Sequence, residues 1–305
     1  MLFLLITQLL LSAFTASATN LPAPPDFVIV GTKKGGTTAL RHNLNKHPNI
    51  FLPDNEVHYY DNERFQAGVL KNTTENYYRT LYELALKSGK KDIQVIGTGS
   101  PRYNDLTEVP YLMYADSPKT KIIFCLRDPV NRALSAYIMS CANENNHHPP
   151  STEDFERRMH NAIQGSSYRL QDYTHKNIAN TGMHSPAGGT LAEALYIIPI
   201  LRFSTLFGRE NILFVCNENT KGEDGKYSYH EVFDFLDVPR QDVDLNNYFE
   251  GNYENVSVSK TLRADMNKVF QPWNDELVSW LKATKHRTAQ DTDRLVNCIQ
   301  SWAKL

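Results

Sequence analysis

The 305-residue chain has no strong excess of either charge, since 32 basic and 34 acidic residues give it a net charge of −2. This balance excludes a nucleic-acid binder that relies on a generally basic surface, and a polyanionic partner would have to meet a local basic region. Internal repeats and low-complexity tracts are absent too. What is present is an ordinary globular composition with 41% apolar residues.

Long apolar runs are scarce, because only residues 2–14 are almost entirely apolar. A membrane-spanning helix needs about 20 such residues, so we expect no stable membrane span. Residues 16–18 (Ala-Ser-Ala) fit the small-residue cleavage pattern of a secretory signal, and the chain then turns polar. We predict a signal peptide at residues 1–18 and a single domain at 19–305. An uncleaved signal anchor is the alternative, because no Lys or Arg precedes the apolar run.

A signal peptide implies the lumen of the secretory pathway or the exterior of the cell. Two Asn-x-Ser/Thr sequons, at Asn72 and Asn255, fit that location and are predicted glycosylation sites.

The chain has only four cysteines. Cys125 and Cys216 lie within apolar runs, where a buried free thiol is the expected state. Cys141 and Cys298 could pair with each other, but sequence alone does not determine the pairing.

Short apolar runs alternate with helical patterns through the rest of the chain. Runs that are apolar throughout are typical of strands covered on both faces, as in a parallel sheet. We therefore predict an α/β fold, a P-loop-like three-layer arrangement with helices flanking a central, mostly parallel sheet. The predicted strands are residues 27–30, 93–96, 121–126 and 211–216, and the predicted helices are 37–46, 75–88, 130–142, 190–207 and much of 262–305.

A glycine-rich turn follows the first predicted strand at residues 31–38 (Gly-Thr-Lys-Lys-Gly-Gly-Thr-Thr). A strand, a glycine turn and a helix start together aim backbone N–H groups at an anion. Gly35 and Gly36 allow the backbone to approach the ligand closely, and Thr37 and Thr38 can donate hydroxyl hydrogen bonds. We predict an anion site here, against the alternative of a glycine turn without a ligand.

The turn differs from the pattern of nucleotide triphosphatases, in which Lys and Ser/Thr follow the last glycine. Thr37 follows Gly36 here, while Lys33 and Lys34 lie inside the turn. The lysine that would hold β- and γ-phosphates is therefore missing. This argues against a P-loop kinase or nucleotide hydrolase and favours a ligand with one 5′-phosphate and one transferable group.

A second motif lies where the strand at 121–126 ends. Arg127 comes at the carboxyl end of that strand, where open α/β sheets bind ligands. Pro129 suits the first turn of a helix, and Ser135 follows about two turns later. An Arg fork with a Ser hydroxyl can hold a second phosphate. The alternative is a surface Arg beside Asp128 as a helix cap.

Together the two motifs resemble the sulfotransferases that use 3′-phosphoadenosine 5′-phosphosulfate. The similarity is greatest to the Golgi carbohydrate type, near the heparan-sulfate O- and N-sulfotransferases, and it covers most of the chain. It implies that residues 34–38 (Lys-Gly-Gly-Thr-Thr) hold the 5′-phosphosulfate and that Arg127 and Ser135 hold the 3′-phosphate. It also implies a Golgi or secreted location.

Further segments carry the resemblance, and some depart from it. Residues 56–61 (Glu-Val-His-Tyr-Tyr-Asp) are similar to the family's Glu-x-His-Phe-Phe-Asp, and residues 100–103 (Ser-Pro-Arg-Tyr) to its Thr-Pro-x-Tyr. Lys260 and Arg263 are the nearest match to a late donor-binding loop, without its flanking cysteines. Gly99 stands where the 3-O-sulfotransferases carry a sugar-binding Lys, which argues against heparan sulfate as acceptor.

The resemblance implies an in-line transfer driven by positioning and electrostatics. Lys34 is the predicted partner of the bridging oxygen and Glu56 the predicted base, with His58 and Asp61 orienting Glu56 or the substrate. Without the resemblance, Glu56 would be interpreted as a solvated loop acid. We predict no metal site.

The acceptor is predicted to be a carbohydrate of the glycosaminoglycan type or a small molecule. The acceptor cleft is expected to be lined by Arg102, Tyr103 and the helix around Tyr196. A secreted anion-binding protein without activity is the remaining alternative.

Overall fold

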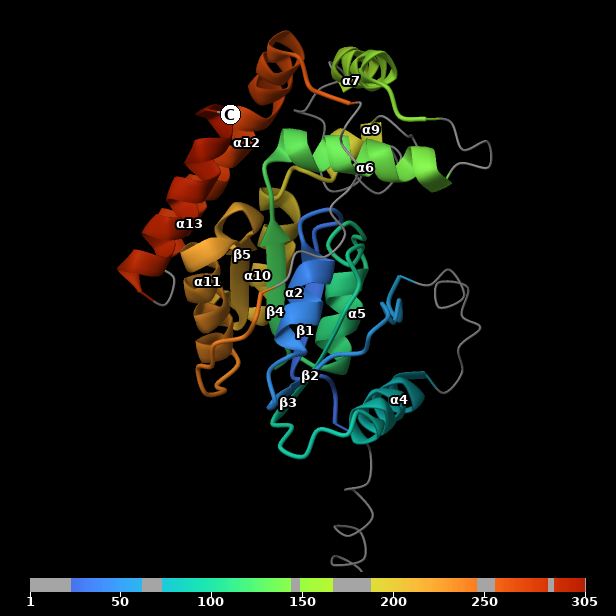
Figure 1. The fold of residues 1–305 in the computed structure, drawn as a ribbon, viewed down its shortest axis with the longest axis vertical. Helices are drawn as coiled ribbons and strands as arrows, with labels where there is room; N and C mark the ends of the chain where they lie inside the picture. The colour runs from blue at the N-terminus through green and yellow to red at the C-terminus, as the bar shows by residue number, and fades with distance from the viewer. Residues whose placement is uncertain are drawn as a thin grey trace, which may run out of the picture.

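Five parallel strands form the central sheet of the computed structural model, and helices cover both of its faces (Figure 1). The structure describes residues 23–61, 73–143, 149–166, 188–245, 256–284 and 288–304. The predicted signal peptide and the two predicted glycosylation sites, Asn72 and Asn255, lie outside these ranges. The strands are β1 (Phe27–Gly31), β2 (Ile50–Phe51), β3 (Val95–Gly99), β4 (Lys121–Leu126) and β5 (Ile212–Cys216), in the order β2-β3-β1-β4-β5.

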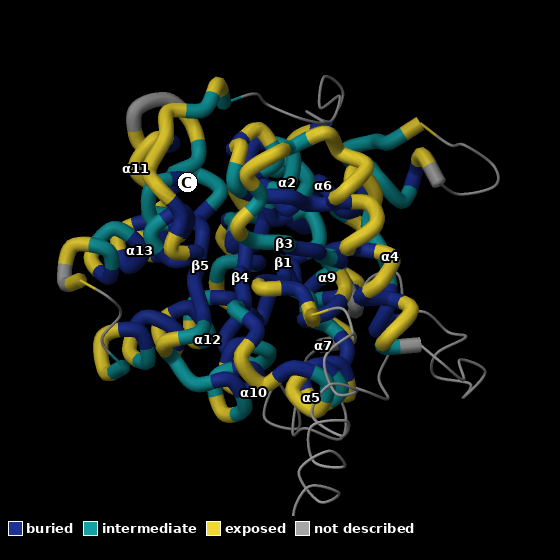
Figure 2. The backbone as a smooth tube through the Cα atoms, turned by 90° about the horizontal axis from the view of Figure 1, so that it is seen from below, coloured by how far each residue is buried: buried dark blue, intermediate teal, exposed yellow. Residues whose placement is uncertain are grey.

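Alternate residues of each strand enter two separate cores. Phe27 and Ile29 of β1 pack into one core, whereas Val28 and Val30 pack into the other. Both sets are almost fully buried, and the strands run through the dark centre of Figure 2. The predicted α/β fold with a doubly covered parallel sheet is therefore confirmed.

The helices divide between the two faces of the sheet. Buried side chains of α2 and α11 belong to the core on one face, whereas the other helices with buried apolar side chains contribute to the larger core opposite. No helix in the described ranges is long and apolar enough to span a bilayer. The main helices are α2 (Thr37–Leu44), α4 (Thr73–Lys87), α5 (Val109–Asp116), α6 (Pro129–Asn143), α7 (Thr152–Ser166), α9 (Gly188–Ala192), α10 (Ile197–Phe207), α11 (Gly222–Phe235), α12 (Lys260–Thr284) and α13 (Ala289–Ser301).

Some elements differ from the predicted ones. The strand predicted at 93–96 lies at Val95–Gly99, where Gly97 packs directly on Phe27: a Cβ at Gly97 would come within 2.2 Å of that ring. The helix predicted at 190–207 divides into α9 and α10. The two-residue strand β2 and the helices α5, α7 and α11 were not predicted.

The cysteine predictions need a correction. Cys216 is not a free thiol, because it forms a disulfide with Cys298 across 82 residues. Cys141 is therefore not the partner of Cys298, and both Cys141 and Cys125 are buried free thiols. The disulfide attaches α13 to the carboxyl end of β5.

Candidate active site

The site lies where three neighbouring strands end on the same edge of the sheet. β1 pairs with β3 on one side and with β4 on the other, and all three are parallel. The chain leaves β1 toward β2 on one side of the sheet and leaves β4 toward β5 on the other, so β1 and β4 flank a topological switch point, where such sheets bind ligands. The loops after β1, β3 and β4 hold the predicted site, and α6 extends from that edge in Figure 1.

The glycine turn after β1 is packed against the end of β4. The Thr32 N–H donates to the Cys125 carbonyl at 3.0 Å. A Cβ on Gly35 would lie 2.5 Å from that same carbonyl oxygen, and Gly36 has φ 101°, a conformation that side chains disfavour. Gly36 precedes the first turn of α2, whose N–H groups lack intrahelical partners by the geometry of any helix. The turn thus has the backbone of an anion cradle.

Two arginines of the second motif hold this turn from the other side. Arg127 donates from Nη1 to the Lys34 carbonyl at 3.2 Å, and Arg132 donates to the Lys33 carbonyl at 3.5 Å. Arg132 is fully buried and forms a 2.8 Å ion pair with Glu193. The structure therefore joins the two predicted anion motifs. Sequence reasoning assigned no role to Arg132, although it lies five residues after Arg127 in the same motif.

The remaining predicted donor residues lie along the same edge. The Lys34 Nζ lies 3.8 Å from the sulfur of Met139 on α6, the helix that also carries the buried Ser135. Thr37 and Thr38 begin α2.

Arg263 also reaches this region, since it pairs with Asp128 at 3.3 Å and with the Asn131 side chain at 2.7 Å. Lys260 is exposed at the first residue of α12. Arg263 therefore contacts the second motif directly.

The predicted base lies in a chain of polar contacts. Glu56 Oε1 is 3.9 Å from Arg41 of α2, and Oε2 is 3.2 Å from His58 Nε2. His58 Nδ1 then lies 2.9 Å from Asp61, whose carboxylate also accepts a short hydrogen bond from Ser100. One small pocket joins this chain to the glycine turn, and it is lined by Ile29, Thr37, Arg41, Glu56, Gly99, Ser100 and Pro101.

Two residues predicted to line the acceptor cleft are buried instead. Tyr103 has no exposed surface, and its hydroxyl accepts the N–H groups of Tyr59 at 2.8 Å and Tyr60 at 3.2 Å. These hydrogen bonds fix the position of the backbone segment that carries Glu56. Tyr196 is 2% exposed and donates to the Arg127 carbonyl at 2.7 Å. Arg102, in contrast, is exposed next to the pocket residue Pro101.

A half-buried carboxyl group, that of Asp105, lies close to Lys33 of the turn and to Arg132. Burial raises the pKa of Asp105 well above its ordinary value, and the neighbouring Glu193 raises it further. Arg132, Lys33 and Arg102 act in the opposite direction. This group was not predicted, because its neighbours come from three distant segments of the chain.

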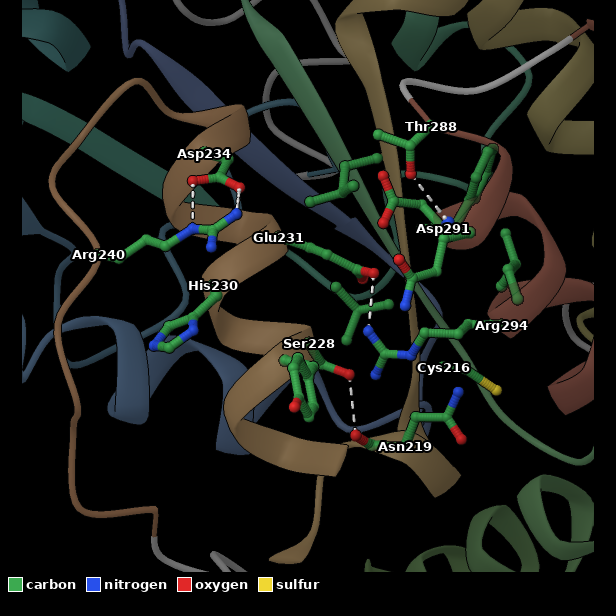
Figure 3. Close-up of a pocket in the computed structure, with 16 residues that line it drawn as sticks. Cys216, Asn219, Ser228, His230, Glu231, Asp234, Arg240, Thr288, Asp291 and Arg294 are labelled. Atoms are coloured by element: carbon green, nitrogen blue, oxygen red, sulfur yellow. Dashed lines mark hydrogen bonds and ion pairs between the residues drawn. The ribbon is translucent and has the colours of Figure 1, made fainter. Parts of the chain in front are cut away.

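A second cavity lies between β5, α11 and α13 (Figure 3). Its charged side chains engage one another: Arg240 forms a two-pronged pair with Asp234, and Arg294 pairs with Glu231 at 2.8 Å. None of the residues that line it belongs to the predicted donor or acceptor set.

A lysine-bearing glycine turn and a second basic motif lie at the ends of neighbouring strands of a parallel sheet. This arrangement defines a transferase-like, phosphate-binding architecture. Comparison with known families agrees, because residues 24–271 match the model of the sulfotransferase domain. The chain belongs to this family.

Individual relatives are similar over most of this chain. It is 27% identical over 251 residues to mouse carbohydrate sulfotransferase 15, covering 70% of this chain and 44% of that protein. It is 28% identical over 229 residues to human heparan sulfate glucosamine 3-O-sulfotransferase 6, covering 74% of this chain and 56% of that protein. The chain thus spans about half the length of these relatives.

A solved sulfotransferase from Alicyclobacillus acidocaldarius has the same fold. Its TM-score to this chain is 0.58 at 20% identity, and the superposition covers 90% of this chain and 96% of that one.

Proposed function

We propose that the protein transfers a sulfuryl group from 3′-phosphoadenosine 5′-phosphosulfate to a hydroxyl or amine of a carbohydrate acceptor of the glycosaminoglycan type. The observation that carries this proposal is the meeting of two basic motifs, in which Arg127 donates to the backbone of Lys34. One motif suits a 5′-phosphosulfate and the other a 3′-phosphate. A lysine within the turn, with threonine after Gly36, fits this donor better than ATP.

The proposed reaction is a single in-line displacement. The acceptor oxygen or nitrogen attacks sulfur as the bond from sulfur to the 5′-phosphate oxygen breaks, which leaves adenosine 3′,5′-bisphosphate. Glu56 takes the acceptor proton, and Lys34 stabilises negative charge on the departing oxygen. His58 and Asp61 orient Glu56, since they continue its chain of contacts.

Donor binding is assigned to both motifs. The 5′ side uses Lys34 with the backbone and hydroxyl groups of Gly35, Gly36, Thr37 and Thr38. The 3′ side uses Arg127 and Ser135, and Arg263 supports it through Asp128. Lys260 is proposed as a further donor contact from the exposed start of α12.

A carbohydrate acceptor is supported by the names of the relatives and by exposed Arg102, which can meet an acidic sugar chain. Gly99 lines the same pocket as Glu56, but it has no side chain with which to bind a sugar. We therefore favour other acidic glycans over heparan sulfate as the acceptor.

We further propose a secretory, Golgi-type location, a cleaved signal at residues 1–18, one domain at 19–305 and glycans on Asn72 and Asn255.

The direct test is transfer from sulfur-labelled donor to a panel of polysaccharides and small alcohols, followed by mapping of the sulfated position. Label on a glycosaminoglycan supports the proposal. If only small alcohols are labelled, the acceptor is a small molecule and not a carbohydrate. Magnesium-dependent ATP turnover without sulfation would refute the proposed sulfuryl transfer.

A further inference from the structure

The peptide group between Arg127 and Asp128 is held at both of its polar atoms. Its carbonyl accepts from the Tyr196 hydroxyl at 2.7 Å, and its N–H donates to Glu218 Oε1 at 2.9 Å. Two side chains from outside the motif therefore fix the plane of one peptide unit. Rotation of that unit would move the Arg127 side chain away from the sheet edge.

The two holding side chains meet at a third, Trp302. The Trp302 Nε1 donates to Glu218 Oε2 at 3.3 Å, and its ring lies edge-on to that of Tyr196 with centroids 5.9 Å apart. Trp302 and Tyr196 are both almost fully buried. Hydrogen bonds to a charged carboxylate are among the stronger ones in proteins, so this arrangement is rigid.

The disulfide keeps Trp302 beside Glu218. The sulfur atoms of Cys216 and Cys298 lie 3.2 and 3.6 Å from Glu218 Oε2, and Cys298 lies one helical turn before Trp302. Cys216, Glu218 and Cys298 bring three potential metal-ligand atoms within 4.8 Å of one another. However, the two sulfurs are bonded to each other, and a metal would require them as thiolates.

We propose that Glu218, Tyr196 and Trp302 form a peptide clamp that positions Arg127 for the 3′-phosphate of the donor. This inference rests on the proposed function, because it assumes that Arg127 meets that phosphate. Glu218 and Tyr196 act through the Arg127–Asp128 peptide and are positioning residues. Trp302, which directly follows the C-terminal helix α13, thereby supports recognition of the 3′-phosphate through Glu218 and Tyr196.

The test compares two nucleotides that differ only in the 3′-phosphate. Calorimetry gives the Kd of adenosine 3′,5′-bisphosphate and of adenosine 5′-phosphate for the intact protein and for Glu218→Ala and Tyr196→Phe. Loss of one charge-assisted hydrogen bond predicts about tenfold weaker binding of the bisphosphate to Glu218→Ala. Binding of the monophosphate should change less than about twofold, because the clamp is specific to the 3′ side. Tyr196→Phe should show the same pattern with a smaller loss.

Two further variants keep the test decisive if Glu218→Ala folds poorly. Glu218→Gln retains a side-chain oxygen that can accept the Asp128 N–H, so it should keep more of the bisphosphate affinity than Glu218→Ala. Glu210→Ala, an exposed acid at the opposite end of β5, should leave both Kd values unchanged.

The possible failures are distinguishable. Equal loss of affinity for both nucleotides, or no loss for either, would overturn the clamp. A wild-type protein that does not prefer the bisphosphate would refute the 3′-phosphate site itself, and the clamp with it.

Discussion

Glu56 differs from an ordinary surface acid because both of its carboxylate oxygens face a basic side chain, Arg41 on one side and His58 on the other. Its side chain is 26% exposed, so an acceptor can still reach it. The contacts fix its orientation toward the pocket that it shares with Thr37. This arrangement is what distinguishes the proposed base from a solvated loop acid.

Replacement of Glu56 by Gln should lower kcat for sulfuryl transfer by about 10²- to 10⁴-fold, because the amide cannot take the acceptor proton. Donor affinity should stay the same, since Glu56 lies on the acceptor side. Steady-state kinetics with labelled donor measures kcat, and calorimetry measures the affinity for the donor. Asp54→Asn, at an exposed acid two residues earlier, serves as the matched control. A Gln variant with wild-type kcat would remove Glu56 from the mechanism.

Lys34 contributes in two separable ways. Its backbone carbonyl accepts from Arg127, whereas its ammonium group is proposed to stabilise the leaving oxygen. Lys34→Ala keeps the carbonyl, so kcat should fall by about 10²- to 10³-fold, as when other transition-state donors are removed. The exposed Lys119→Ala should have no effect. Unchanged activity in Lys34→Ala would contradict the proposed mechanism.

At the scale of the elements, local patterns were sufficient to predict four of the five strands and the strand, turn and helix that frame each of the two proposed anion motifs. The apolar run at 121–126 and the start of the helix after Arg127 agree with β4 and α6 to within one residue. Contacts between distant segments were not predictable. The pairing of Cys216 with Cys298, the burial of Tyr103 and the hold of Glu218 on the Asp128 N–H all depend on which elements become neighbours in space.

The packing of α11 against α13 should make stability depend on pH. Burial, together with Asp291 of α13, raises the pKa of Glu231 from 4.5 to about 7, against the opposing effect of Arg294 of the same helix. Between these two values the native state holds a proton that the unfolded chain has lost. The free energy of unfolding therefore falls as pH rises from about 4.5 to about 7.

Substitution of Glu231 by Gln should flatten this dependence. The contribution should amount to about 1–2 kcal/mol between pH 5 and pH 8, after allowance for the partly exposed side chain. Urea unfolding of both proteins at the two pH values measures it, with the exposed Glu83→Gln as control. A variant that keeps the wild-type slope would show that Glu231 is not responsible.

For the whole molecule, the disulfide is the covalent connection between the sheet and the C-terminal helix. It closes a segment of 82 residues. Chain entropy for a loop of that length corresponds to about 4 kcal/mol of stabilisation. Reduction should therefore lower the Tm by about 6 °C in a chain of this size.

Thermal unfolding with and without a strong reductant measures this shift. A variant with Ser at both Cys216 and Cys298 should unfold at the lower Tm and no longer respond to the reductant. Substitution of the free thiols Cys125 and Cys141 by Ala should leave the response intact. An equal Tm under both conditions for the wild type would contradict a stabilising disulfide.

The pairing of β1 with β4 has a consequence for how such a protein can diversify. The glycine turn and Arg127 follow strands joined by backbone hydrogen bonds, so their separation is determined by main-chain spacing of about 4.8 Å and not by replaceable side chains. Arg102, in contrast, is exposed on the loop after β3 and bears little on the packing. Substitutions around Arg102 can therefore accumulate and change the proposed acceptor while the proposed donor stays the same.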